Sequence, residues 1–214
     1  AIRNNVIPVD YQQQIRKILG NEDIIILEPA VCLVSGEQRE DWLNQLDRSS
    51  WYYWRTLRNY LLIEKGWNEP SIRSLDESTD RILIQFVPPS IDQFDIRGLV
   101  IGYIQSGKTA NYTALIAKAA DVGYRLVIVL SGVDNGLRLQ TQIRINKELV
   151  GYHDGNHPNA VTLPDDANKR WVQFTTEELD GDFRSGNLNN VILGGVQPIL
   201  MVIKKNLLTE LCLE

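Results

Sequence analysis

The chain has 214 residues, of which 43% are hydrophobic, and its 22 Lys and Arg against 27 Asp and Glu give a net charge of -5. This charge argues against a protein held to nucleic acid by general attraction to phosphates. The two cysteines, Cys32 and Cys212, have no metal-ligand or redox spacing, and no apolar run approaches the ~20 residues that cross a bilayer. We therefore expect a cytoplasmic protein without a membrane partner. The chain starts at Ala1 rather than Met, and we expect a piece of a longer protein.

The first part of the chain has the apolar spacing of amphipathic helices separated by polar breaks. We leave the type of the apolar stretch 22–34 open, because Pro29 interrupts it without a clear period. The pattern predicts a mainly helical N-terminal subdomain over residues 1–90. The expected helices cover residues 11–19, 38–46, 51–63 and a last segment from Ser78 or Thr79 to residue 87.

From residue 97 onward, short apolar runs alternate with amphipathic segments, which is typical of βαβ units and a parallel sheet. We expect strands at 99–103, 125–130 and 198–203, and helices at 108–120 and 137–150, with Gly151 ending the last helix. The boundary between the two parts falls near residues 88–96. The fold class predicted for residues 91–214 is an α/β P-loop domain with a parallel sheet.

A phosphate-binding motif lies between the first expected strand and its helix. Residues 102–109 read GYIQSGKT and match G-x-x-x-x-G-K-[ST] completely. In this context backbone N–H groups and the helix N-terminus converge on phosphate oxygens, the lysine reaches the β and γ phosphates, and the threonine hydroxyl completes the coordination of Mg²⁺. The predicted ligands are therefore ATP and Mg²⁺. The predicted contacts are Gly102, Gln105, Ser106, Gly107, Lys108 and Thr109, with Lys108 and Thr109 in the catalytic roles and Thr109 as the metal ligand.

The segment around this motif resembles a known family. Residues 97–151 combine QSGKTAN, a strand, and LSG-x-x-N-x-L-R-x-Q-T-Q, and the similarity continues more weakly at 67–89 and at PILMVIKKN, residues 198–206. The whole resembles the Z-one domain family, bacterial proteins described as endonucleases and related to superfamily two helicases. The resemblance implies an incomplete RecA-like lobe of a motor ATPase that acts on nucleic acid, with DNA as the expected partner. It also implies partner proteins from a bacterial restriction or phage-defence system.

In motors of this kind, the segment after the second strand touches the nucleic-acid backbone. The resemblance carries this role to Ser131, Gly132, Asn135, Arg138, Gln140 and Gln142, with Arg138 and Gln142 as the foremost contacts. Hydroxyl, amide and guanidinium groups can donate to phosphate oxygens without reading bases. The same residues also fit an ordinary polar face on a surface helix, and the sequence leaves both interpretations open.

Two parts of a complete motor are absent from the sequence. ATP hydrolysis in this class needs an acidic pair at the end of a later strand, yet residues 127–130 lead into Ser131 and residues 198–203 into Lys204. A second lobe that would supply an arginine finger is also missing. We therefore expect this chain to bind nucleotide and to hydrolyse it poorly. Nuclease chemistry is not expected either, since Pro164-Asp165 is followed by no Glu-x-Lys or Asp-x-Lys.

Two weaker patterns have ordinary explanations. His153 and His157 in HDGNH supply only two imidazoles in a Gly-Asn loop, which favours a solvated loop over a zinc site. Trp51 and Trp54, interleaved with arginines, could stack on bases. However, their spacing with Leu57 favours the packed face of a helix.

Two other functions compete with the motor ATPase. A small-molecule P-loop kinase would use Lys108 in the same way but needs an arginine-bearing lid, which is not evident. A protein-interaction module could use the P-loop only to sense nucleotide while its helical half binds a partner.

Overall fold

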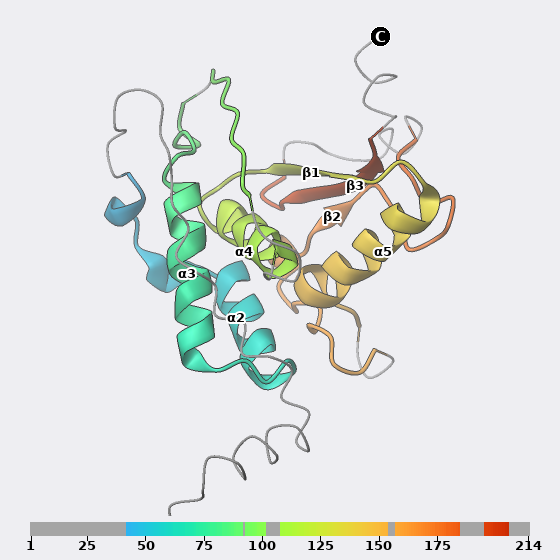
Figure 1. The fold of residues 1–214 in the computed structure, drawn as a ribbon, viewed down its shortest axis with the longest axis horizontal. Coiled ribbons are helices and arrows are strands. Elements are labelled where there is room, and N and C mark those ends of the chain that lie inside the picture. Colours follow the sequence, from blue (N-terminus) through green and yellow to red (C-terminus); the bar gives the residue numbers. More distant parts are fainter. Residues whose placement is uncertain (1–41, 92, 102–107, 154–156, 185–194, 206–214) are drawn as a thin grey trace, which may run out of the picture.

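The computed structural model describes residues 42–91, 93–101, 108–153, 157–184 and 195–205. The fold is mixed α/β (Figure 1): a helical N-terminal part is followed by a small parallel sheet with helices packed on it. The helices are α2 (Tyr53–Ile63), α3 (Glu69–Leu83), α4 (Lys108–Asp121) and α5 (Asn135–Ile145), which continues as a π-helical turn over Asn146–Val150. No helix in these ranges is long and apolar enough to cross a membrane.

The sheet has the strand order β1-β3-β2, and both pairings are parallel. β1 (Leu126–Ser131) pairs along its whole length with β3 (Ile199–Lys204), and these two strands confirm the predictions at 125–130 and 198–203. β2 has only two residues, Val172–Gln173, too few to give a periodic signal in the sequence. The other edge of β1 pairs with no strand among the described residues.

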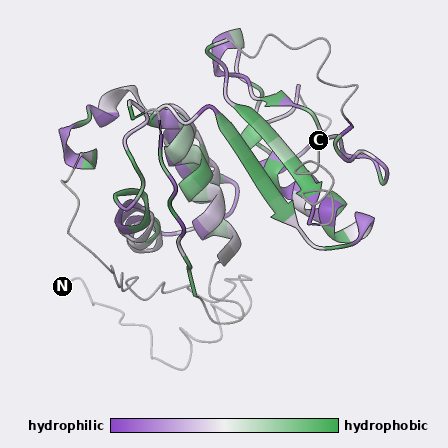
Figure 2. Cartoon of the chain, turned by 90° about the horizontal axis from the view of Figure 1, so that it is seen from above, coloured by the Kyte–Doolittle hydropathy of each residue, from purple (hydrophilic) through white to green (hydrophobic). Residues whose placement is uncertain are grey.

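One buried cluster joins the N-terminal helices to the sheet. It contains Leu57 of α2, Leu75 of α3, Ala117 of α4 and the β3 residues Leu200 and Val202. Side chains alternate along β3, so Ile199, Met201 and Ile203 face the opposite way and pack with Phe174 and Phe183. Figure 2 shows the two longer strands as a largely hydrophobic pair beside the helices. The helical part therefore shares its core with the residues beyond the predicted boundary at 90.

Two helices begin where side-chain oxygens accept hydrogen bonds from backbone N–H groups. The carboxylate of Asp121, at the end of α4, accepts from the N–H groups of Tyr52, Tyr53 and Trp54 at 2.7–3.0 Å, so α2 is capped from a distant part of the chain. The Asn68 side chain accepts from Ser71 N at 2.8 Å and caps α3.

Three predicted elements need correction. The helix expected from Ser78 or Thr79 instead starts at Glu69; Thr79 Oγ1 bonds back to the Leu75 carbonyl at 2.7 Å, which lets it sit inside a helix. The described end of the expected helix 38–46 is a 3₁₀ turn at Leu43–Gln45. The described part of the expected strand 99–103 pairs with no strand, and Leu99 and Ile101 are 83% and 86% exposed. Three expected helices are confirmed within a few residues: 51–63 by α2, 108–120 by α4, and 137–150 by α5 with its π-helical turn. Gly151, with φ 89°, ends the last of them as expected.

A buried lysine ties α4 to α3. Lys118 has no exposed surface, and its Nζ lies 2.5 Å from Asp76 Oδ1 and 2.6 Å from Asp80 Oδ1. The same ammonium lies 4.7 Å from the centre of the Trp54 ring. Two carboxylates and an aromatic face thus replace the water that a buried ammonium loses.

We expect Lys118→Met to lower the free energy of unfolding by about 1.5–3 kcal/mol, because Asp76 and Asp80 lose the hydrogen-bonded ammonium between them while Asp80 keeps its pair with Arg48 at 2.7 Å. Urea denaturation followed by circular dichroism measures this change. The control is Arg58→Ala, which breaks the exposed pair with Glu69 and should cost less than about 1 kcal/mol. Equal losses in the two variants would contradict the role given to the buried pair.

Candidate functional site

The candidate site is the N-terminus of α4, where the phosphate-binding motif meets the helix. α4 begins at Lys108, the lysine of the motif, and Thr109 follows in its first turn. Gly102, Gln105, Ser106 and Gly107 lie outside the described residues. The structure thus places the last two motif residues at a helix N-terminus, the position that favours an anion.

Thr109 is contacted by a residue that sequence reasoning did not select. Arg144, in the last turn of α5, donates from Nη1 to Thr109 Oγ1 at 3.0 Å. Tyr112, one turn along α4, lies close enough to Thr109 and Arg144 for both to influence the pKa of its hydroxyl, which burial raises. The first turn of α4 and the end of α5 are thereby joined through the hydroxyl predicted to bind Mg²⁺. A threonine hydroxyl is a hard oxygen donor of the kind that Mg²⁺ accepts.

A half-buried carboxylate lies in the same cluster. Burial raises the pKa of Glu148, and the positive charges of Arg144, Lys65 and Lys147 oppose that rise. Glu148 belongs to the π-helical turn that continues α5, a conformation often found at functional sites. Arg144, which contacts Thr109, is therefore also the cation with the largest influence on this acid.

Three of the six residues expected to touch nucleic acid are buried. Ser131, at the end of β1, donates from its hydroxyl to the Ile203 carbonyl. Arg138 is fully buried and donates to the carbonyls of Thr176 and Glu178, and Gln142, also fully buried, accepts from Thr175 Oγ1 at 2.6 Å. Arg138 and Gln142 thus hold the segment after β2 against α5, while Ser131 joins β1 to β3, and none of the three has an exposed surface for a phosphate.

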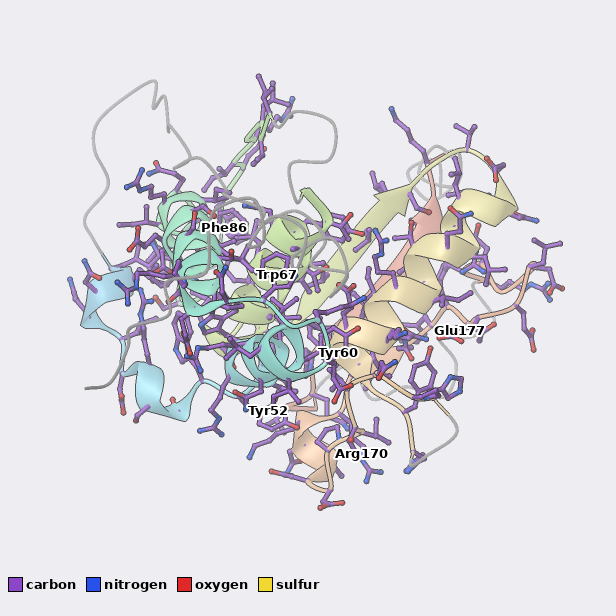
Figure 3. All side chains as sticks on the ribbon, turned by 60° about the horizontal axis from the view of Figure 1, so that its bottom comes forward. Tyr52, Tyr60, Trp67, Phe86, Arg170 and Glu177 are labelled. Atoms are coloured by element: carbon purple, nitrogen blue, oxygen red, sulfur yellow. The ribbon has the colours of Figure 1, made fainter. Side chains whose placement is uncertain are left out.

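A polar network extends from Gln142 to the protein surface and was not foreseen from the sequence. Asn146 Oδ1 accepts from Gln142 and Gln173, while its amide donates to Glu177 Oε1 at 2.7 Å. The Tyr152 hydroxyl donates to the same Glu177 oxygen, and burial together with this carboxylate raises the pKa of Tyr152. Figure 3 shows Glu177 beside α5. Residues far apart in sequence meet here, which no local pattern could indicate.

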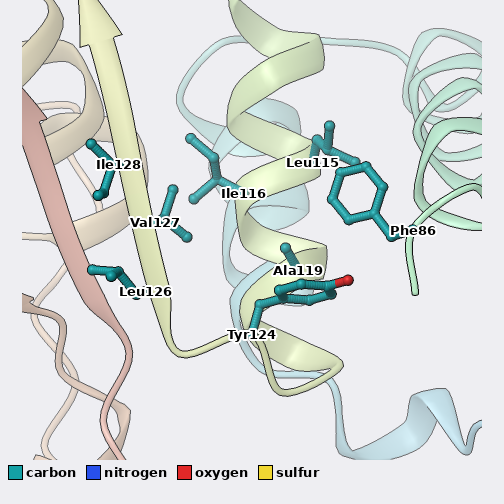
Figure 4. A pocket seen from close by; sticks show the side chains of 8 residues that line it. All are labelled: Phe86, Leu115, Ile116, Ala119, Tyr124, Leu126, Val127 and Ile128. Carbon is teal, nitrogen blue, oxygen red and sulfur yellow. The ribbon is translucent and has the colours of Figure 1, made fainter. Parts of the chain in front are cut away.

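Two hollows lie away from the start of α4. The first has a volume of about 260 Å³ between α4 and β1 and is lined mainly by apolar groups, among them Leu115, Ile116 and Val127 (Figure 4). The second, of about 380 Å³, is lined by Trp51, Trp54, Asp76 and the arginines at 48, 55 and 58. Both tryptophans are buried, which confirms that they pack the helical part rather than form an open stacking surface.

No cluster of metal ligands accompanies the weaker sequence patterns. Among the described residues, no group of three or more His, Cys, Asp or Glu side chains could hold a metal ion. His157 stacks on the Tyr152 ring with centroids 3.7 Å apart, and Asp154 lies outside the described residues.

Comparison of the chain with models of protein families, with curated proteins and with solved structures gave no match. The site is therefore interpreted from its own residues.

We expect Arg138→Met to lower the free energy of unfolding by about 2–4 kcal/mol, because the carbonyls of Thr176 and Glu178 lose a charged donor. Chemical denaturation measures the effect. Arg73→Met, which removes an exposed arginine on α3, should leave stability within about 0.5 kcal/mol. A stable Arg138 variant would show that the buried contacts matter little.

Stability should depend on pH through Glu148. Because burial raises the pKa of this group in the folded state, its contribution to stability is complete below its unfolded pKa and is lost as pH rises through the folded pKa. The difference in unfolding free energy between wild type and Glu148→Gln should therefore shift in favour of the variant as pH rises from 4 to 7. Denaturation curves at several pH values test this, with exposed Glu64→Gln as the matched control. A difference that is constant with pH would contradict the expectation.

Proposed function

We propose that this chain is the nucleotide-binding part of a P-loop ATPase that binds ATP with Mg²⁺ at the start of α4. The observation that carries the proposal is that α4 begins at the motif lysine, Lys108, with the Thr109 hydroxyl in its first turn. Arg144, whose Nη1 lies 3.0 Å from Thr109 Oγ1, adds a positive charge beside this end of the helix that suits phosphate oxygens.

The handedness of parallel crossovers limits where a strand before α4 could join the sheet of the proposed RecA-like lobe. α4 and α5 both pack on the sheet face that carries Leu200 and Val202. Since β1, α5 and β3 form one parallel crossover, a strand that precedes α4 must lie on the other side of β1 if both crossovers have the usual right hand. The exposed apolar residues 99–101 are the candidates for that strand. Adding this strand to the sheet would set the phosphate-binding loop at the carboxyl end of the sheet, where ligands bind in open α/β folds.

One face of β1 is open to solvent. Leu126, Ile128 and Leu130, which share that face, are all exposed, and the apolar hollow beside α4 reaches the same strand. Exposed apolar side chains gathered on a sheet face are the usual sign of a surface that another segment or a partner covers.

Action on nucleic acid is the part of the proposal that rests on the resemblance to the Z-one family. With Ser131, Arg138 and Gln142 buried, contacts with a DNA backbone would fall to the exposed neighbours Gly132 and Gln140. These groups are uncharged, so their contribution to affinity would depend little on salt. Partners from a restriction or defence system, and nuclease activity elsewhere in a longer protein, belong to the same proposal.

A nucleotide-sensing interaction module is the second candidate. The exposed apolar side chains of β1 favour it, because they offer a surface for a partner without requiring hydrolysis. In this case nucleotide would change the association with that partner and would not be consumed.

We expect Lys108→Ala to weaken binding of Mg·ATP at least tenfold, because the charge at the phosphates is lost. Isothermal titration calorimetry measures the change, and Lys169→Ala, which removes an exposed lysine in the turn Ala167–Lys169 before β2, is the control. Phosphate release should stay far below the rate of a motor in every variant. Fast release that Lys108→Ala abolishes would overturn the expectation of poor hydrolysis, and equal affinity of wild type and variant would overturn the site itself.

A further inference from the structure

The guanidinium of Arg144 lies against Thr109, the predicted metal ligand. Arg144 is exposed, and its Nη1 bonds the uncharged hydroxyl of Thr109 at 3.0 Å. A guanidinium carries several N–H donors in a planar fork that suits phosphate oxygens. Among the described residues, the hydrogen bond of this guanidinium to the neutral Thr109 hydroxyl leaves it without an anionic hydrogen-bond partner.

The position of Arg144 favours an anion. Its Nη1 lies 3.0 Å from Thr109 Oγ1, in the first turn of α4, and the N-terminus of a helix itself favours negative charge. Glu148 and Glu64 are the acids of this region, since both act with Arg144 on the Tyr60 hydroxyl, and burial raises the pKa of Glu148.

We propose that Arg144 contacts the terminal phosphate of a bound nucleoside triphosphate and so distinguishes triphosphate from diphosphate. This inference rests on the nucleotide site proposed above. In the described state Thr109 accepts a hydrogen bond from Arg144; once Thr109 turns its oxygen to the metal, the guanidinium loses that partner and is free to bond phosphate oxygens. Arg144 thereby exchanges a neutral hydrogen bond for a charged one that only the longer nucleotide offers.

A purely structural role for Arg144 makes a different prediction. If its bond to Thr109 serves only to join α5 to α4, removing the guanidinium would lower stability and affect the binding of both nucleotides equally. The relative affinity for triphosphate and diphosphate is therefore the quantity that separates the two roles.

The test measures the dissociation constants of Mg·ATP and Mg·ADP by isothermal titration calorimetry for wild type, Arg144→Ala and Arg144→Gln. The proposal predicts that both variants weaken ATP binding about tenfold or more and change ADP binding less than about twofold. Arg73→Ala, an exposed arginine on α3, should change neither value. Circular dichroism confirms the fold of each variant, and Arg144→Gln, which keeps most of the side-chain length, serves if the alanine variant is unstable.

Each outcome decides the matter. Loss of ATP affinity with ADP affinity kept supports the proposal, whereas equal changes, or none, overturn it while leaving the nucleotide site intact. Failure of the wild-type chain to bind either nucleotide, or binding that Lys108→Ala does not weaken, rejects the proposed function itself.

Discussion

The ion pairs of Lys118 with Asp76 and Asp80 hold α4 against the N-terminal helices, and the candidate site depends on how that helix is held. At its far end Asp121 accepts the first N–H groups of α2, so both contacts tie α4 to residues that precede it by about forty or more positions. A helix fixed at several points presents its first turn in a defined place. That first turn contains Thr109, the residue with which Arg144 and Tyr112 interact.

The sequence predicted correctly those helices and strands that are marked by a pattern within a few neighbouring residues. α4, β1 and β3 follow from a short apolar run, a glycine stop or an alanine-rich face, each readable within a few residues. α3 was misplaced because Ser78 and Thr79 resemble caps, while their hydroxyls in fact bond back into the helix. Residues 99–101 have the composition of a strand, but strand pairing needs a neighbour, and none lies beside them in the described structure.

The residues of the candidate site also fall into two groups, those that a sequence motif indicates and those that only the fold brings together. The motif indicated Lys108 and Thr109 from spacing alone, and α4 begins where that spacing requires. Arg138 and Gln142 looked like surface contacts because a helix sequence does not state which polar side chains the neighbouring loop will cover. No sequence pattern indicates Arg144, because its contact is with Thr109, which lies 35 positions earlier in the chain and reaches it only in the folded state.

Hydrogen exchange measured by mass spectrometry tests the central claim most directly, because it locates bound nucleotide along the chain. With saturating Mg·ATP, the account predicts slower exchange in peptides covering the motif and the first turn of α4, and in the peptide carrying Arg144, with little change in α3. Unchanged exchange at the start of α4, or protection confined to another part of the chain, would contradict it.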